Sequence, residues 1–508
     1  MLPDAESCAP RFGVSNVNDY ICANSDDMVT FTIALLVLIG GYFLYGAYVD
    51  RIFAPDERQT PASTKADGVD FIPLPTWKIF MIQFLNIAGL GPIFGAIMGA
   101  QFGTASYLWI VFGTIFAGAV HDFFSGTLSI RNGGASLPEI VGLHLGSKTK
   151  KVMCVFTLVL MVLVGAVFVS GPAELLAGMT PDWMNAIFWI VVIFLYYILA
   201  TILPVDKIIG KIYPLFAIAL LFMAIGILVM LYVKSPDLPE IWNGFGTKYE
   251  KNPIFPMMFI SIACGAISGF HATQSPLMAR CMTKEKHCRP IFYGAMVAEG
   301  VVALIWAAAA TCFFQENGII DQVTGKAFSG ATVATRISKE WLGTFGGVLA
   351  ILGIVAAPIT SGDTALRSAR LIAADFFHVD QRPISKRLLI CLPLFLITFG
   401  VLLYSLRDAE GFKIIWRYFA WCNQTLSVFT LWAITVYLVR SKKNFYITLL
   451  PALLMTLVCS TYICIAPEGL SLPQNLSYII GGTYALASLV WFIRWYKSLK
   501  KNTITCSM

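Results

Sequence analysis

The chain has 508 residues, of which 57% are hydrophobic and only 13% are charged. An average soluble domain is about 45 to 50% apolar and about 25% charged, so a soluble fold could not cover this much apolar surface. The net charge of +7 is explained by basic residues in short loops and gives no indication of nucleic-acid binding.

Apolar stretches long enough to cross a membrane recur along almost the whole chain. A helix needs about 20 residues to cross the hydrocarbon layer of about 30 Å. Barrel strands would alternate apolar and polar residues, whereas these stretches are apolar all round. We therefore predict an all-α polytopic membrane protein with about 13 transmembrane helices. They lie near residues 28–50, 79–101, 104–130, 152–174, 184–203, 212–233, 254–276, 291–314, 343–366, 386–405, 412–439, 445–466 and 475–496.

Basic residues predict the orientation in the membrane. They gather in alternate loops, for example around Lys148, Arg280 and Arg440. Because cytoplasmic loops carry the excess of Lys and Arg, we predict an inner-membrane protein with its N-terminus outside and its C-terminus in the cytoplasm. Residues 1–27 lack the basic start of a cleavable signal peptide. Cys8 and Cys22 lie in this outside segment and either form a disulfide or stay free.

The second and seventh predicted helices contain groups that break helices. Glycine costs a helix interior about 1 kcal/mol and proline about 3 kcal/mol, and freed backbone groups need partners in the protein or in a wet cavity. We predict that both helices are broken at a substrate site. Its residues would be Asn86, Gly89, Gly91, Pro92, Ser268, Gly269, His271 and Gln274. The alternative for the glycines is that they only allow close helix packing.

The positions of the two breaks indicate an internal repeat. Helices two and seven are five spans apart, so they cross the membrane in opposite directions, as equivalent helices of two inverted repeats do. The predicted organisation is an outside segment 1–27, a peripheral helix 28–50, repeats 79–233 and 254–439, two peripheral helices within 445–496, and a cytoplasmic tail 497–508.

Ionisable residues inside predicted spans are candidates for ion or proton coupling, because they are expensive to place in a membrane. His121 and Asp122 are neighbours in the third span, and only one of them should point squarely at the core. Glu299 is a lone carboxylate in the middle of the eighth span. Asp363 shares a helix face with Arg367, and we expect these two to pair. Each histidine and aspartate has a packing role as its alternative.

Several separate motifs resemble one protein family. They are Ile87–Pro92, the run Ala117-Gly-Ala-Val-His-Asp-Phe with Arg131 after it, Ser268–Ala272, Tyr293–Met296, and Asp363–Arg370. Together they resemble the carbon starvation protein A (CstA) family over about residues 28–440. The resemblance implies a bacterial inner-membrane carrier for pyruvate or short peptides that is made during starvation. It also implies a similarity to the amino acid/polyamine/cation superfamily, with its five-plus-five inverted-repeat (LeuT-like) core.

The resemblance to that superfamily also implies a cation site. Sodium-coupled members have an Asn-x-x-Gly-x-Gly run, which Asn86–Gly91 resembles. A backbone carbonyl followed by adjacent Thr and Ser hydroxyls is matched by Ala357, Thr360 and Ser361, which would form an oxygen cage with Ala88. Pro92 departs from the pattern of a second sodium site. The alternative for the hydroxyls is bonding back to their own helix.

The function predicted from the sequence is ion-coupled uptake of pyruvate or short peptides, most simply with protons. A sodium-coupled carrier of amino acids or other small carboxylates and a nutrient sensor without transport are the alternatives. A channel would need a continuous polar pore, and an enzyme a metal or nucleophile motif, which the sequence does not display. The predicted partners are the lipid bilayer and a small carboxylate or peptide. No cofactor is expected apart from the coupling ion, H⁺ or Na⁺.

Overall fold

A computed structural model describes residues 28–202, 209–245, 253–322, 327–381, 383–407 and 411–505. Helices make up most of this part of the chain, and the β pairing found within it is one isolated bridge between Ile320 and Ala327. The predicted all-α class is therefore confirmed. The predicted outside segment, with Cys8 and Cys22, and the last residues of the predicted tail lie outside the described residues.

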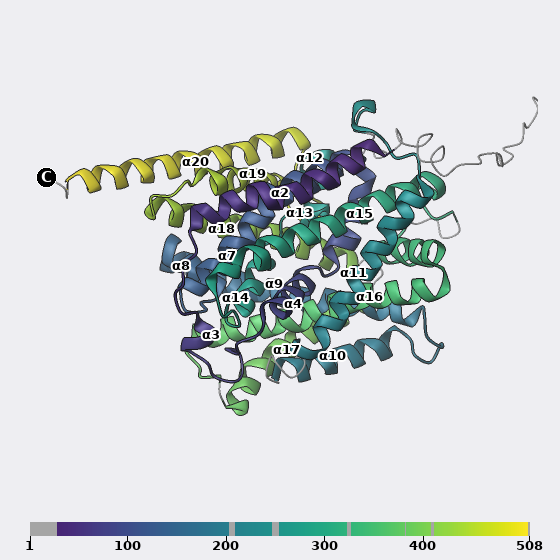
Figure 1. Ribbon diagram of the computed structural model, residues 1–508, viewed down its shortest axis with the longest axis horizontal. Helices are drawn as coiled ribbons and strands as arrows, with labels where there is room; N and C mark the ends of the chain where they lie inside the picture. The colour runs from purple at the N-terminus through teal and green to yellow at the C-terminus, as the bar shows by residue number, and fades with distance from the viewer. Residues whose placement is uncertain are drawn as a thin grey trace, which may run out of the picture.

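The helices form one elongated bundle, with α20 and α2 at the top of the view and α10 and α17 at the bottom (Figure 1). The first half contains α2 (Val29–Phe53), α3 (Pro61–Thr64), α4 (Thr76–Ile87), η1 (Gly91–Gly95), α5 (Ala96–Gly99), η2 (Ala100–Phe102), α6 (Ala105–Gly113), η3 (Thr114–Gly118), α7 (Ala119–Arg131), α8 (Leu137–Leu145), α9 (Ser147–Ala177), α10 (Ala186–Ile202), α11 (Ile209–Lys234) and η4 (Ile241–Asn243). The second half contains α12 (Ile254–Ser261), α13 (Ala263–Ala266), α14 (His271–Ala279), η5 (Glu285–His287), η6 (Arg289–Tyr293), α15 (Gly294–Asn317), α16 (Gly330–Phe377), α17 (Ile384–Arg407), α18 (Gly411–Arg440), α19 (Tyr446–Ile465) and α20 (Gln474–Thr505).

Many of these helices are long and apolar enough to cross a membrane. In the described part of the chain ten helices pass that test, or eleven if α4 and the helix that follows it form one bent span. α10 is apolar but shorter. α12, α13 and α14 are short pieces in the region of the seventh predicted span. The protein is thus a multi-pass membrane protein.

Helix α16 begins earlier than predicted. The expected span started at residue 343, but the helix starts at Gly330, where the Ser329 side chain accepts a hydrogen bond from the amide of Thr332. A turn at Gly343, with φ of 66°, separates the first part from the membrane-spanning part. Left-handed backbone of this kind favours glycine, so the predicted start coincides with a real change of direction.

The helices pack as two groups that meet at the broken segments. α9 contacts α10, α16 and α17, and α16 also contacts α11. On the other side α15 contacts α2, α4, α5 and α6, and α14 contacts α4 and α7. We call these the α9 group and the α15 group. Contacts of α11 and α16 with α4 and α15, and of α16 with α14, join the two groups.

Candidate transport site

The first broken helix changes direction at Ala88. α4 ends at Ile87, Ala88 has φ −77° and ψ 52°, and the chain resumes as the wide turn η1 at Gly91. The helices on the two sides of the break are bent by 53°. Pro92 lies in the first turn of the resumed helix, where its missing N–H would have had no helical partner in any case.

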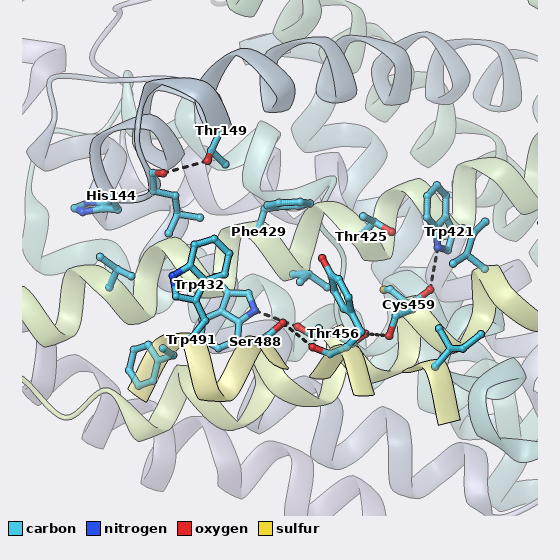
Figure 2. A pocket seen from close by; sticks show the side chains of 18 of the residues that line it. His144, Thr149, Trp421, Thr425, Phe429, Trp432, Thr456, Cys459, Ser488 and Trp491 are labelled. Carbon is cyan, nitrogen blue, oxygen red and sulfur yellow. Dashed lines mark hydrogen bonds between the residues drawn. The ribbon is translucent and has the colours of Figure 1, made fainter. Parts of the chain in front are cut away.

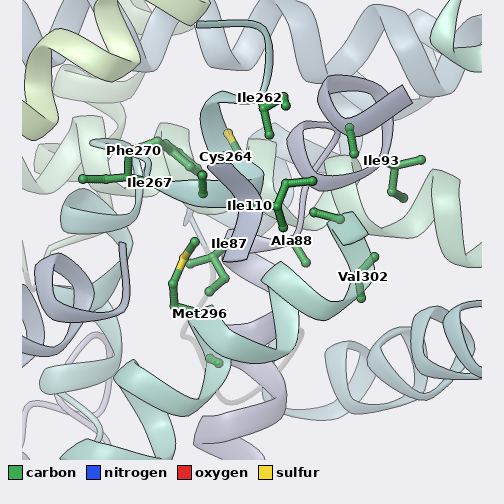
Figure 3. Packing of buried hydrophobic residues seen from close by; sticks show 14 of the residues in the cluster. Ile87, Ala88, Ile93, Ile110, Ile262, Cys264, Ile267, Phe270, Met296 and Val302 are labelled. Atoms are coloured by element: carbon green, nitrogen blue, oxygen red, sulfur yellow. The ribbon is translucent and has the colours of Figure 1, made fainter. Parts of the chain in front are cut away.

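The second broken helix contains a stretch of extended backbone. α13 ends at Ala266, Ile267 is extended with φ −157° and ψ 141°, and α14 begins at His271. Figure 3 shows Ile87 and Ala88 of the first break and Cys264 and Ile267 of the second in one buried apolar cluster, and η1 contacts α13. Both sequence motifs thus lie at real interruptions of the helices.

Glycines allow these two segments to approach closely. A Cβ atom on Gly91 would lie 2.1 Å from the Cβ atom of Cys264, and one on Gly269 would lie 2.3 Å from the carbonyl oxygen of Asn423. Gly89 similarly packs against Phe168 and Ser361. Close packing, the alternative that the sequence left open, accounts for these three glycines.

We expect Gly91→Ala to destabilise the protein, because neither backbone segment can move away without disturbing the other. Overpacking of this kind costs about 1 to 3 kcal/mol. The measurement is the melting temperature of the purified protein. Gly482→Ala, on a surface with nothing within 4 Å, is the matched control and should leave it unchanged. Cys264→Gly should restore the stability of Gly91→Ala, and failure to do so would contradict the contact.

Asn423 of α18 holds the second break. Its side-chain oxygen Oδ1 accepts hydrogen bonds from the amide of Phe270 at 2.6 Å and from the Ser268 hydroxyl at 3.0 Å. Its backbone carbonyl accepts from the amide of Gly269 at 3.2 Å. One asparagine thus provides oxygen atoms for the donors at the start of α14, where the helix dipole favours negative charge.

A chain of ionisable side chains runs through the α15 group. Asp122 of α7 contacts the Nδ1 atoms of both His121, at 2.7 Å, and His271, at 2.9 Å. The other ring nitrogen of His271, Nε2, lies 3.5 Å from a carboxylate oxygen of Glu299 on α15. All four side chains are buried. His121 and Asp122 are neighbours on α7, and the His121 ring turns onto the Asp122 carboxylate, which also reaches His271.

Buried polar atoms without a protein partner gather on the same helices. They are both carboxylate oxygens of Glu299, Nε2 of His271, Oε1 of Gln274, Nδ2 of Asn86 and Oε1 of Gln83, each without a hydrogen bond to another described residue. Gln83 and Ser275 join α4 to α14 by a bond of 3.4 Å. Buried polar groups are nearly always hydrogen-bonded in proteins, so this concentration marks a place where a proton, an ion or a polar ligand is needed.

The two hydroxyls of the predicted oxygen cage, on Thr360 and Ser361, are both buried. The Ser361 hydroxyl lies 3.1 Å from the carbonyl oxygen of Leu85 and 2.9 Å from that of Ala357. Thr360 bonds back to the carbonyl of Ala357 at 2.8 Å. The hydroxyls therefore bond to their own helix, as the alternative proposed, and Ser361 also reaches the end of α4. The carbonyl that it reaches belongs to Leu85, not to Ala88.

We expected Asp363 and Arg367 to pair with each other, but each has a different partner. Asp363 accepts a hydrogen bond from the Tyr196 hydroxyl at 2.8 Å. Arg367 lies 3.2 Å from Asp70, in the segment before α4, and Arg370 lies 2.8 Å from the same carboxylate. Both arginines are buried rather than exposed at a membrane surface. They attach α16 to the beginning of the first broken helix.

Asp70 is the centre of this charged cluster. Burial alone would raise the pKa of its carboxyl group, but the guanidinium groups of Arg370, Arg367 and Arg280 lower that pKa to about 2. The neighbouring backbone is tied to the second broken helix as well, because the amide of Leu74 bonds to the carbonyl of Cys281 at 3.1 Å. A cavity of about 960 Å³ adjoins the cluster and is lined by Asp70, Arg280 and other charged residues.

Sequence reasoning missed Asn423, Asp70 and Tyr196. Asn423 lies within an apolar span, where a buried amide is costly, and that cost was a usable signal. Asp70 lies in a polar loop among other acids, and nothing local distinguishes it. Tyr196 is one of many aromatic residues inside the predicted spans, so its contact with Asp363 follows only from the fold.

The bundle with two broken helices around a buried polar centre has a fold seen in solved membrane proteins. The manganese transporter of Eremococcus coleocola matches 85% of this chain and 99% of its own, with 12% identity and a TM-score of 0.54. MhsT, solved with L-phenylalanine, matches 82% of this chain and 98% of its own, with 13% identity and a TM-score of 0.54. At such identity the likeness shows the fold alone.

The chain belongs to the carbon starvation protein CstA family, whose model matches residues 26–187, 179–341 and 314–462. An uncharacterized membrane protein of Haemophilus influenzae is 45% identical over 57% of this chain and 92% of its own. The peptide transporter CstA of Campylobacter jejuni is 31% identical over 54% of this chain, and the pyruvate/proton symporter BtsT of Escherichia coli is 28% identical over 54%. The matched region spans 48% of each of these last two relatives.

Proposed function

We propose that this protein imports pyruvate or a short peptide across the bacterial inner membrane by proton symport. The proposed topology has 13 spans, with α10 and the α12 to α14 pieces added to the long helices, the N-terminus outside and the C-terminus in the cytoplasm. Helices α4 to α11 would form one repeat and α12 to α18 the inverted one. The names of the peptide and pyruvate relatives support the two substrate classes.

The observation that carries the proposal is the chain Asp122, His271 and Glu299. An imidazole between two carboxylates can take a proton from one side and pass it to the other. Glu299 has no hydrogen-bond donor other than this imidazole within reach among the described residues. An ionised carboxylate buried in that way is costly, so a proton gained or lost there changes the stability of the surrounding arrangement.

The side chains of Asp122, His271 and Glu299 lie where a proton can influence the movement of helices. His271 is the first residue of α14, and its neighbours in the chain bond to Asn423. We infer that alternating access moves the α15 group, which holds Asp122 and Glu299, relative to the α9 group. The pairs of Asp70 with Arg367 and Arg370 join the two groups on the side of the 960 Å³ cavity. They would close the path to that cavity.

Sodium coupling is the second candidate, and one observation favours it. The Ser361 hydroxyl and the Leu85 and Ala357 carbonyls bring three oxygen atoms together between α16 and the break after α4. Hard monovalent cations prefer such oxygen ligands. Ala88 and Thr360 are close in the chain to these groups and would complete the cage.

The test is uptake by the purified protein in proteoliposomes. Labelled pyruvate and a labelled dipeptide are offered separately, each under a proton gradient or a sodium gradient. We expect one of them to accumulate under the proton gradient. Accumulation under sodium alone, lost in Ser361→Ala, would replace proton coupling with the sodium alternative. Binding of either substrate without accumulation under any gradient would contradict transport and favour a nutrient sensor.

A further inference from the structure

A second cavity lies away from the broken helices, among α8, α18, α19 and α20. Its volume is about 670 Å³. Figure 2 shows His144, Thr149, Trp432 and Trp491 toward one end, Trp421 and Cys459 at the other, and Phe429 and Thr425 between them. Along α18 its lining runs from Trp421 to Val436, which is about 22 Å at about 1.5 Å per residue. The cavity is longer than half of a hydrocarbon layer of about 30 Å.

The long wall of this cavity offers little to a polar ligand. The indole N–H of Trp421 donates to the Cys459 carbonyl at 3.2 Å, and that of Trp432 donates to the Thr456 hydroxyl at 3.1 Å. The hydroxyl of Ser488 bonds back to its own helix at 2.9 Å. The Thr425 hydroxyl has no partner among the described residues, but the other groups are already paired and most of the lining is apolar, so the wall is suited to a hydrocarbon chain.

One end of the cavity is different. Both ring nitrogens of His144 are buried and lack a partner among the described residues. Burial, and then the neighbouring Arg440 guanidinium, lower the pKa of His144 to about 4, so the imidazole is neutral at pH 7 and can donate one N–H bond. Arg440 is itself exposed and donates to the Leu143 carbonyl at 3.2 Å. This end therefore combines a fixed positive charge with an unused donor.

We propose that the cavity binds one anionic phospholipid, with an acyl chain along the tryptophan wall and the phosphate beside His144 and Arg440. The occupant must be an amphipath, because the polar end and the apolar wall are continuous. It must be anionic, because the charge at the polar end is positive. Basic pockets between membrane helices on the cytoplasmic side select lipids in this way, at about 1 kcal/mol for each basic group. The inference does not depend on the transport function.

The experiment measures lipid retention by the full-length protein with native mass spectrometry. The probes are dioleoyl-phosphatidylglycerol, dioleoyl-phosphatidylcholine and inorganic phosphate. We expect the glycerol lipid to be retained at least about 5-fold better than the choline lipid, the ratio that about 1 kcal/mol gives. Arg440→Gln should reduce this ratio about 5-fold and His144→Ala should also reduce it. Lys286→Gln, which removes an exposed charge in another loop, is the matched control.

Because the ratio of two lipids is read within each variant, a change in overall stability does not imitate the result. Ser460→Phe, which fills the apolar wall, should abolish retention of both lipids. Equal retention of the two lipids, an unchanged ratio in Arg440→Gln, or retention of inorganic phosphate as strong as that of the glycerol lipid would overturn the proposal. So would a stable dimer that retains no lipid, because a second copy of the chain would then occupy the cavity.

Discussion

Replacing Glu299 by Gln is expected to abolish accumulation driven by the proton gradient while exchange of substrate across the membrane continues. Glutamine keeps the size of the side chain but cannot gain or lose a proton, so His271 would have only Asp122 as a carboxylate partner. We expect accumulation to fall at least about 10-fold, because coupling through this group would be absent rather than weakened. Accumulation and exchange are measured in the same proteoliposomes.

Glu174→Gln is the matched control for this variant. Glu174 is an exposed carboxylate in α9, and the same chemical change there should leave accumulation unaltered. Normal accumulation by the Glu299 variant would remove this residue from the mechanism. Asp122 would then be the remaining carboxylate beside His271. Loss of both accumulation and exchange would indicate a structural role instead.

Replacing Asp70 by Asn is expected to lower stability strongly and to leave the path to the 960 Å³ cavity open. The change leaves Arg367 and Arg370 buried without their carboxylate, and breaking a buried pair in this way costs about 3 to 5 kcal/mol. Melting temperature measures the first effect. Passive efflux of preloaded substrate from proteoliposomes, which should increase, measures the second. Asp56→Asn, in an exposed pair with Arg58, is the control and should change neither.

The same carboxylate predicts a dependence of stability on pH. The pKa of Asp70 in the folded protein is about 2, below its value of about 3.9 in an unfolded chain. The contribution of the Asp70 carboxylate to the stability of the folded protein is therefore fully present above about pH 4 and is lost as the pH falls through about 2. The wild type should lose stability in this window and Asp70→Asn should lose less. If adding Arg370→Gln to the Asp70→Asn variant restores no stability, the unpaired charge is not the cause.

Hydropathy was sufficient to predict the class of fold, because the thickness of a membrane fixes the length of an apolar helix that crosses it. The two breaks could also be located, since proline and glycine carry a known cost at membrane depth. What the glycines do could not be read from the chain. The contact of Gly91 with Cys264 joins residues that are far apart in sequence, and only the packed structure distinguishes it from a binding role.

Pairings between distant charged residues were the least predictable part of the site. Helical spacing favoured a pair of Asp363 with Arg367, because these residues share a face. The protein instead places a loop carboxylate, Asp70, against the arginine and a tyrosine against the aspartate. Spacing along one helix predicts which residues face the same way, but the partner is selected by whichever chain segment packs there.

Asn423 has a consequence for how tightly a substrate can bind. If the start of α14 receives a carboxylate, the incoming oxygen must displace the Asn423 carboxamide from Phe270 and Ser268. That carboxamide is tethered in place and acts as an internal competitor at high effective concentration. The free energy of substrate binding is then the difference between the free energies of two similar sets of hydrogen bonds. A modest affinity of this kind allows a substrate that enters on one side to leave on the other.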